Sequence, residues 1–318
     1  MADRVLIVLG GNAFVTPGEP LTMAGQFAFA NQVLSALAPL LLGDDQIVIT
    51  HGNGPQVGHM LTRVEAALGE AYAIPLEVCV AESEGELGYV LEQSLHNLFA
   101  ERGCVRPIAS LLTQVVVDPH DAAFGEPSKP VGPFYDRMQS EELSRQGFAV
   151  REDAGRGFRR VVPSPAPQEI IDVEVIETLL EAGVVVIAAG GGGIPVVRKE
   201  GRLRGVEAVV DKDLASALLG QELDARLMVI LTGVPCAYRD FGSPDQQPLG
   251  RLDVARAEQL LAEGHFAPGS MQPKIEAALA FASRPDCRAV ICDSDSLSEA
   301  LKGNAGTIIE LSEGEPTQ

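Results

Sequence analysis

Residues 46–58 read Gln-Ile-Val-Ile-Thr-His-Gly-Asn-Gly-Pro-Gln-Val-Gly. The first five residues form a short apolar and β-branched run, which is typical of a strand buried on both faces. A turn follows at Gly52, Asn53 and Gly54, and Pro55 suits the first turn of a helix because its fixed φ fits there. This stretch therefore predicts a strand, a tight polar turn and a helix in succession, the unit from which parallel sheets are built.

The same unit recurs along the 318 residues of the chain. Short apolar runs predict strands at 5–9, 46–50, 184–189, 227–231, 289–292 and 307–310. Amphipathic stretches predict helices at 24–42, 56–68, 76–100, 168–182 and 274–282. We expect Pro167 to open the fourth helix and Gly183 to close it. The alternation predicts a three-layer α/β/α sandwich with a largely parallel, open central sheet.

Residues 119–165 interrupt this alternation. They contain six prolines and a charged run at 151–160. A disordered linker is poor in aromatic residues, whereas this segment holds Phe134, Tyr135, Phe148 and Phe158, which can pack. We therefore predict a single domain over 1–318, with 119–165 forming a small, protruding, lid-like subdomain inserted within it.

The composition limits the class of protein. With 44 Asp and Glu against 24 Lys and Arg, the formal charge is −20, which excludes a nucleic-acid binder that relies on overall positive charge. No apolar run approaches the ~18 residues of a membrane span, and the first residues do not resemble a signal peptide. The five cysteines form no C-x-x-C pair, which fits a reducing compartment. We expect a globular, cytoplasmic protein with no nucleic-acid or membrane partner.

Glycine-rich segments follow four of the predicted strands, at 10–12, 51–54, 190–193 and 232–233. Ligands of open parallel sheets bind beyond the carboxyl ends of the strands. Glycine lets backbone N–H groups approach an anion closely, so these turns predict a phosphate site. No P-loop motif is present. The glycines of 52–58 resemble a dinucleotide fingerprint whose third glycine comes one residue late, so an NAD or FAD enzyme is kept as an alternative.

Lysine is scarce, with five residues against 19 arginines. Phosphoryl transfer needs positive charge aimed at the transferring oxygens, and a lysine supplies a compact point charge. Lys212 stands between two aspartates at a predicted helix start, where Asp213 could cap the helix or hold the lysine in position. Lys274 lies in a first helical turn, which is unfavourable for a cation unless an anion is present. Lys129 stands where the protruding segment begins, whereas Lys199 and Lys302 are expected to be ordinary surface charges.

Seven segments, in this order, resemble the carbamate kinases of the amino-acid kinase family. They are 9–13, 50–58, 129–135, 159–165, 189–196, 205–213 and 264–271 with 273–274, so the resemblance runs nearly end to end.

The resemblance implies a homodimeric α/β/α sandwich that transfers a phosphoryl group between ATP and carbamate, in catabolism towards ATP, with Mg²⁺ brought in by the nucleotide. It implies that the carbamoyl phosphate end is held by Gly10, Gly11, Asn12, Gly52, Asn53, Gly54, Gly191 and Gly192. It places Lys129, Lys212 and Lys274 around the transferring group, with Asp213 orienting the lysines. It assigns the nucleotide to Tyr238, Phe266, Ala267, Pro268, Gly269, Ser270 and Met271, together with Lys274. The protruding segment would close over the site, and no protein ligand of the metal is assigned.

The chain departs from the usual pattern of this family at several positions. Glu84 and Glu86 stand where glutamines are often found, Phe14 replaces a common leucine, and Gln272 and 232–237 also differ. Two alternatives stay open beside carbamate kinase. One is a related phosphotransferase acting on an amino-acid carboxylate such as acetylglutamate, and the other is a catalytically silent nucleotide-binding sensor.

Overall fold

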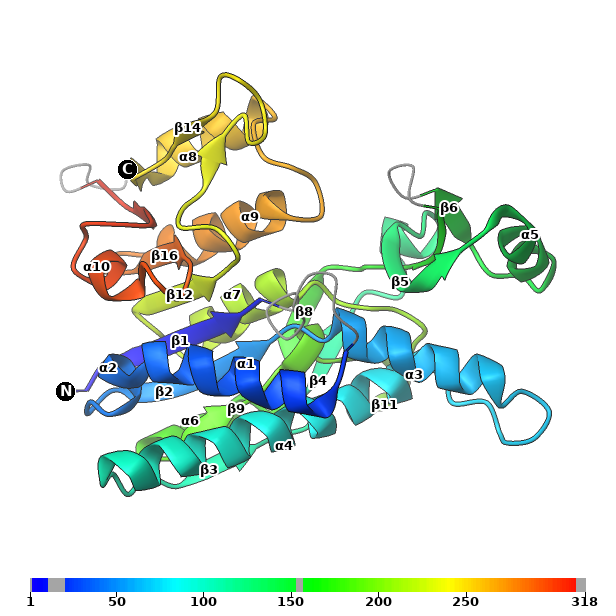
Figure 1. The fold of residues 1–318 in the computed structure, drawn as a ribbon, viewed down its shortest axis with the longest axis horizontal. Coiled ribbons are helices and arrows are strands. Elements are labelled where there is room, and N and C mark those ends of the chain that lie inside the picture. Colours follow the sequence, from blue (N-terminus) through cyan, green and yellow to red (C-terminus); the bar gives the residue numbers. More distant parts are fainter. Residues whose placement is uncertain (1, 11–20, 153–156, 313–318) are drawn as a thin grey trace.

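The computed structural model describes residues 2–10, 21–152 and 157–312 (Figure 1). Its centre is an eight-stranded sheet with the order β15-β17-β16-β12-β1-β2-β9-β3. The bounds of these strands are β1 Arg4–Leu9, β2 Gln46–His51, β3 Ile108–Ser110, β9 Val185–Ile187, β12 Leu227–Leu231, β15 Arg251–Asp253, β16 Arg288–Cys292 and β17 Thr307–Glu310.

The central sheet is largely parallel. In β1, Val5 pairs with Ile47 of β2 on one side and with Leu227 of β12 on the other. Within the described part of this sheet, the only antiparallel neighbours are β16 and β17. The predicted open, largely parallel sheet is therefore confirmed.

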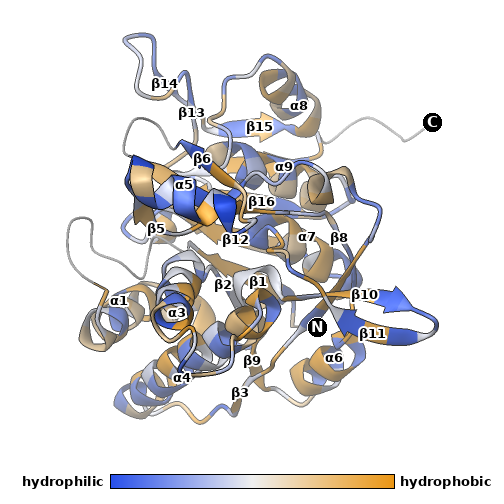
Figure 2. Cartoon of the chain, turned by 90° about the vertical axis from the view of Figure 1, so that its right-hand side faces the viewer, coloured by the Kyte–Doolittle hydropathy of each residue, from blue (hydrophilic) through white to orange (hydrophobic). Residues whose placement is uncertain are grey.

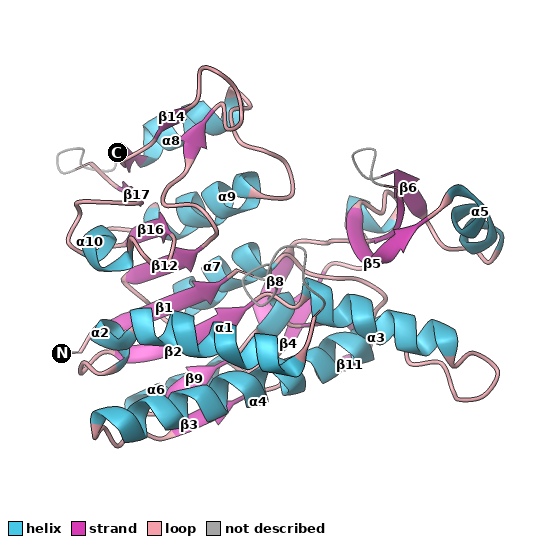
Figure 3. Cartoon of the chain, viewed as in Figure 1, coloured by secondary structure: helices cyan, strands magenta, loops and turns pink. Residues whose placement is uncertain are grey.

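Helices cover both faces of the sheet, as Figure 3 shows. Successive side chains of a strand point to opposite faces, so Leu6 and Val8 enter one core while Val5, Ile7 and Leu9 enter the other. The first core is closed by α6 Val173–Glu181, α7 Lys212–Glu222, α8 Val254–Ala262 and α9 Met271–Ala282. The second is closed by α1 Met23–Ala36, α2 Ala38–Leu41, α4 Leu76–Arg102 and α10 Leu297–Leu301. This is the predicted three-layer sandwich.

The predicted helix over 168–182 is wrong in its first part. Residues Pro167–Ile170 form strand β8, which pairs antiparallel with β4 Gln114–Val117, and α6 begins only at Val173. Pro167 therefore does not open a helix; it begins a strand at the edge of a sheet, where its missing N–H costs no ladder hydrogen bond. The remaining strands of this four-stranded sheet are β10 Ile194–Lys199 and β11 Arg202–Gly205. Gly183 does follow α6, with a φ of 77°.

A separate antiparallel sheet lies to one side of the sandwich (Figures 1 and 2). It consists of β5 Lys129–Tyr135, β7 Phe158–Val162 and β6 Val150–Glu152, with helix α5 Arg137–Arg145. Val131 and Val162 join it to a small core that includes residues of α3 Gly54–Ala66 and of α4. The two bodies meet so closely that a Cβ on Gly58 would lie 3.3 Å from the Cα of Gly132. The extent of the subdomain, 119–165, and its action as a lid stay predictions.

The first predicted helix, 24–42, is divided in two at Leu37 because Pro39 begins the short helix α2. A proline cannot donate to the preceding turn but fits the start of a new one. No helix in the described ranges has both the length and the apolar character needed to cross a bilayer.

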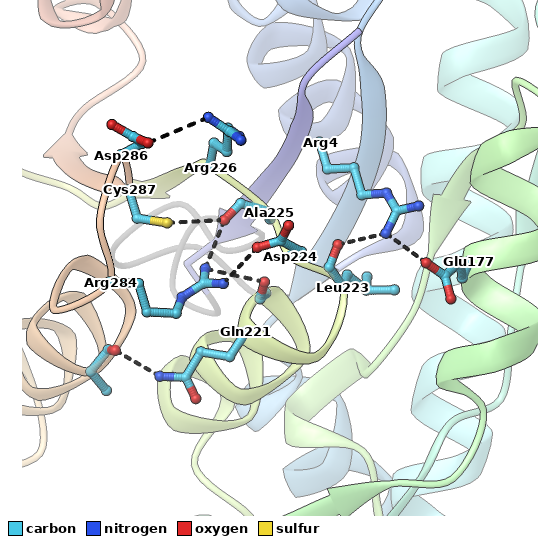
Figure 4. A network of polar contacts seen from close by, with 12 residues as sticks. Arg4, Glu177, Gln221, Leu223, Asp224, Ala225, Arg226, Arg284, Asp286 and Cys287 are labelled. Carbon is cyan, nitrogen blue, oxygen red and sulfur yellow. Dashed lines mark hydrogen bonds and ion pairs between the residues drawn. The ribbon is translucent and has the colours of Figure 1, made fainter. Parts of the chain in front are cut away.

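Polar contacts fasten the amino edge of the sheet (Figure 4). Arg284 Nη2 donates to the carbonyl oxygen of Ala225 at 2.7 Å, and Arg4 Nη1 donates to that of Leu223 at 2.8 Å. Arg4 also reaches Glu177 on α6 at 2.8 Å. These arginines satisfy carbonyl oxygens at and just after the end of α7 that have no helical partner.

Candidate active site

Two lysines pair with one carboxylate near the carboxyl ends of the parallel strands, at the opposite end of the sheet from the arginine contacts. Lys212 Nζ lies 2.6 Å from Asp213 Oδ1, and Lys274 Nζ lies 2.9 Å from Asp213 Oδ2. Lys212 and Asp213 begin α7, and Lys274 lies in the first turn of α9. These two helices pack side by side. The side chain of Asp213 is 4% exposed and those of the lysines are 12% and 13% exposed. The structure thus brings together three of the four residues expected to be catalytic.

The charges in this cluster hold one another in place. Burial alone would raise the pKa of Asp213, but attraction to Lys212 and Lys274 outweighs it and lowers the pKa to about 2. Burial lowers the pKa of Lys212, attraction to Asp213 opposes this, and repulsion from Lys274 adds to it. Two cations sharing one anion leave a net positive centre, which is what an incoming phosphoryl group requires.

Lys129 reaches this centre from the protruding sheet through a different carboxylate. Its Nζ lies 2.6 Å from Asp211 Oδ2, while Asp211 Oδ1 accepts the backbone N–H of Asp213 at 2.9 Å. Asp211 is the residue that caps α7. The sequence pattern suggested Asp213 as the cap, whereas Asp211 holds that position. An aspartate directly before a helix start is the usual signal for a cap.

The turn after β2 packs against the glycines that follow β9. Asn53 is buried, and its Nδ2 donates to Ser83 Oγ at 2.7 Å. A Cβ on Gly191 would lie 1.9 Å from Asn53 Nδ2, and one on Gly192 would lie 2.5 Å from the carbonyl oxygen of Val210. Both glycines also have positive φ, 67° and 99°. Glycine is therefore required here by packing as well as by conformation.

The other predicted phosphate-binding residues lie nearby or outside the described ranges. Gly10 directly follows β1 and lines a cavity, and Gly54 begins α3. The backbone N–H of Gly52 donates to Leu9 and that of Gly192 to Ala189, so these two groups already have partners within the fold. Gly11, Asn12 and Phe14 lie outside the described residues. Contact of any of these residues with phosphate stays a prediction.

Two buried titratable residues beside the turns escaped the sequence analysis as functional candidates. Burial lowers the pKa of His51 to about 4, helped by repulsion from Lys212, while a hydrogen bond with the backbone of Gly52 opposes the change. Burial raises the pKa of Glu84 well above its usual value, although hydrogen bonds from Thr113 and Gly190 oppose this. His51 is therefore uncharged at neutral pH, and burial favours the protonated form of Glu84. Burial is the main cause of both shifts, and no local pattern in the sequence signals it.

A cavity of about 740 Å³ opens beside Lys274. Six of the residues predicted to face the nucleotide line it: Tyr238, Phe266, Ala267, Gly269, Ser270 and Met271; Pro268 is not among the lining residues. The sequence analysis missed Phe241, whose ring centre lies 5.6 Å from that of Tyr238, and also His265 and Asp293. A larger cavity of about 1040 Å³ lies at the amino edge, lined by Asp3, Arg226 and Arg288, and contains none of the predicted site residues.

Within the described ranges, no group of three His, Cys, Asp or Glu side chains could hold a metal ion. The two carboxylates closest to the lysines, Asp211 and Asp213, are already bound by them. Magnesium binds well to one or two carboxylates together with substrate phosphates, so the residues present fit an ion carried by the nucleotide better than one held by the protein.

The family model described as "Amino acid kinase family" matches residues 3–293. The chain belongs to the amino acid kinase family. Membership makes it a phosphotransferase that uses a nucleotide, which sets aside the NAD or FAD alternative.

Relatives of this amino acid kinase match over nearly its whole length. The carbamate kinase-like protein YqeA of Escherichia coli is 45% identical over 313 residues, 97% of this chain and 99% of that protein. Carbamate kinase of Thermococcus kodakarensis is 45% identical over 309 residues, 96% of this chain and 98% of that protein. Among solved structures, carbamate kinase from Giardia lamblia bound to AMP-PNP superposes with a TM-score of 0.91 at 38% identity, covering 98% of this chain and 99% of that one.

Proposed function

We propose that this chain is a carbamate kinase. It catalyses reversible phosphoryl transfer between ATP and carbamate, forming ADP and carbamoyl phosphate, and works mainly towards ATP. The observation that carries the proposal is the meeting of Lys212 and Lys274 on buried Asp213, where the cavity beside Lys274 approaches the glycine turns. The carbamate kinases among its full-length relatives support the choice of acceptor.

The lysines act as a preorganised positive centre. Asp213 stays ionised and holds both ammonium groups, so neither has to be ordered when negative charge moves between donor and acceptor oxygens. Each ammonium has three donors and uses one on Asp213. The remaining donors are directed to the phosphoryl oxygens.

Lys129 supplies a third charge from the protruding sheet. Its ion pair with Asp211 joins that sheet to the cap of α7, the helix that carries Lys212. We infer that an arriving phosphate competes with Asp211 for Lys129 and draws the subdomain over the site. In this proposal, closure excludes water from the transferring group.

Substrates bind on either side of this centre. Carbamoyl phosphate lies on the turns at Gly10, Gly52, Asn53 and Gly54. The family resemblance assigns Gly11 and Asn12 to the same site, and these two lie outside the described residues. The nucleotide occupies the cavity beside Lys274, with its base towards Tyr238 and Phe241. Mg²⁺ enters with the nucleotide and neutralises part of its phosphate charge.

The packing around the turns supports a small acceptor. Asn53 is buried against Gly191, and the next residues, Gly190 and Gly192, would clash with their neighbours if they carried a Cβ. Little room is left there for the side chain of an amino acid. This tight packing favours carbamate over acetylglutamate and similar carboxylates.

The decisive experiment is the appearance of ATP from carbamoyl phosphate and ADP with Mg²⁺. A folded protein that gives no ATP under these conditions would refute the proposal. ADP binding without any transfer would support a silent nucleotide sensor instead. A screen of carboxylate acceptors in the reverse direction separates carbamate from acetylglutamate.

We further propose that the enzyme is a cytoplasmic homodimer. Exposed apolar side chains gather on neighbouring elements, with Met23 on α1, Val78 and Tyr89 on α4, and Leu112 after the edge strand β3. A patch of this kind is typical of an interface. Light scattering after gel filtration measures the mass directly, and a mass of about one chain would overturn the assignment.

A further inference from the structure

Glu84 is a buried acidic residue that the proposed mechanism does not use. It lies on α4, is 2% exposed, and its Oε2 accepts the backbone N–H of Thr113 at 2.9 Å. Its other carboxyl oxygen, Oε1, is buried and has no hydrogen-bond partner within the described residues. A buried polar atom without a partner costs free energy, so this side chain does not simply fill the core. Its defined contact is the one with Thr113.

Thr113, which is fully buried, passes this contact on to the glycine segment 190–193. The backbone N–H of Ala189 donates to Thr113 Oγ1 at 2.9 Å, and that of Ile194 donates to the carbonyl oxygen of Thr113 at 2.8 Å. Ala189 has a φ of 49°, and a residue with a side chain keeps this conformation only where its surroundings hold it. Thr113 therefore fixes the chain directly before and directly after the segment, and Glu84 fixes Thr113.

Within this segment, the short 3₁₀ helix η3 Gly190–Gly192 packs against β2, α4 and α7. One side of η3 touches the turn after β2, since a Cβ on Gly191 would lie 1.9 Å from Asn53 Nδ2. The other side touches the start of α7, since a Cβ on Gly192 would lie 3.2 Å from the backbone nitrogen of Lys212. The position of η3 therefore sets the distance between Asn53 and Lys212.

We propose that Glu84 is a positioning residue for the phosphoryl transfer. By holding Thr113 it holds η3, and η3 keeps Asn53 and Lys212 at the spacing that the reaction requires. Without this acceptor, the buried N–H of Thr113 is left unpaired and η3 is free to shift. This role rests on the proposed function, since it takes Asn53 as part of the carbamoyl phosphate site. None of these residues lines the cavity assigned to the nucleotide, so ADP binding should not depend on Glu84.

Glu84→Met tests this role, because methionine is unbranched and of similar length but has no carboxyl acceptor. In the ATP-forming assay we expect kcat/KM for carbamoyl phosphate to fall about tenfold, the size of effect that loss of one buried hydrogen bond produces, with a higher KM for carbamoyl phosphate. KM for ADP should stay at the wild-type value. A variant that is merely less stable contains less active enzyme but keeps both KM values, so this split reports on positioning. An unchanged KM for carbamoyl phosphate, or an equal rise in KM for ADP, would overturn the role.

A conservative variant tests the hydrogen bond itself. Glu84→Gln keeps an oxygen acceptor for Thr113 and should retain a KM for carbamoyl phosphate close to that of the wild type. Glu101→Met makes the same substitution as Glu84→Met at an exposed glutamate of α4, and this matched control should behave as the wild type. If Glu84→Gln is as impaired as Glu84→Met, the hydrogen bond to Thr113 is not the cause.

Thr113→Val tests the next contact and does not depend on the folding of Glu84→Met. Valine keeps the branched shape of threonine but removes the hydroxyl that accepts the N–H of Ala189. It should raise KM for carbamoyl phosphate and leave KM for ADP unchanged. Because Glu84 and Thr113 act on the same segment, the double variant should be less impaired than the product of the two single effects. Effects that multiply in full would show two independent sites and contradict the proposed chain of contacts.

The outcomes separate this role from the proposed function. Wild-type protein that forms no ATP from carbamoyl phosphate and ADP overturns the function and this role with it. Wild-type protein that forms ATP, together with a Glu84→Met variant that keeps the wild-type KM for carbamoyl phosphate, overturns the role of Glu84 and leaves the function standing.

Discussion

Acid should destabilise this protein through His51. The ring is buried, and its pKa falls from 6.5 to about 4 on folding. Between these values the unfolded chain binds a proton that the folded chain does not, so stability is present above pH 6.5 and is lost as the pH falls. The full loss below pH 4 is about 3.4 kcal/mol, from about 2.5 pKa units at 1.36 kcal/mol each. At pH 5 the loss already reaches about 2 kcal/mol.

Urea unfolding at several pH values between about 7 and 5 measures this effect. Other groups also titrate, so the informative quantity is the difference in free energy of unfolding between wild type and His51→Gln. Whatever its value at pH 7, that difference should move by about 2 kcal/mol in favour of the variant at pH 5. His96→Gln, at an exposed histidine of α4, is the matched control and should show no such movement. A difference independent of pH would refute the assignment of a buried, neutral His51.

Three further predictions concern the site. Lys212→Ala and Lys274→Ala should each lower kcat by about 100-fold or more, because each variant removes a charge aimed at the transition state. Lys302→Ala is the control and should keep the wild-type rate. Equal rates in all three variants would contradict the assignment of the lysines. In urea unfolding, Glu84→Gln should gain stability relative to the wild type as the pH rises, because the raised pKa of buried Glu84 makes the contribution of this residue fully present below the unfolded pKa and lost as the pH rises through the folded pKa. A difference independent of pH would argue against the raised pKa. Gly191→Ala should lower the thermal midpoint and the activity together, because its Cβ would lie 1.9 Å from Asn53 Nδ2 at a φ of 67°; an unchanged midpoint would show that the loop can move aside.

Most of the sandwich was predictable because its signals are local. The strands at 227–231 and 307–310 were predicted with the bounds that the structure shows, since a buried parallel strand is a short apolar run between turn residues. The paired lysines were also accessible, because a cation beside an aspartate at a helix start is unusual in a chain with few lysines. The side chains of Val5 and Leu6 enter different cores, and this follows from the two-residue period of a strand alone.

Other features depend on partners distant in the chain. Residues 167–170 have the composition of a helix start, but they form a strand because they pair antiparallel with β4. The ion pair between Lys129 and Asp211 could not be predicted from local sequence, because the two residues are 82 positions apart and come together only in the folded chain. The sequence around His265 is that of an ordinary polar loop. Its hydrogen bond with Asp240 joins residues 25 positions apart and exists only in the folded chain.

The amino-acid sequence by itself determined most strands of the central sheet, several of the helices, the glycine turns and the scarce lysines, because periodicity, turn chemistry and helix capping act within a few residues. The tertiary structure alone decided which charges are buried, which carboxylate each lysine meets, and that His51 is buried and neutral. Those properties depend on desolvation and on distances of about 3 Å between separate elements, and no local pattern encodes either.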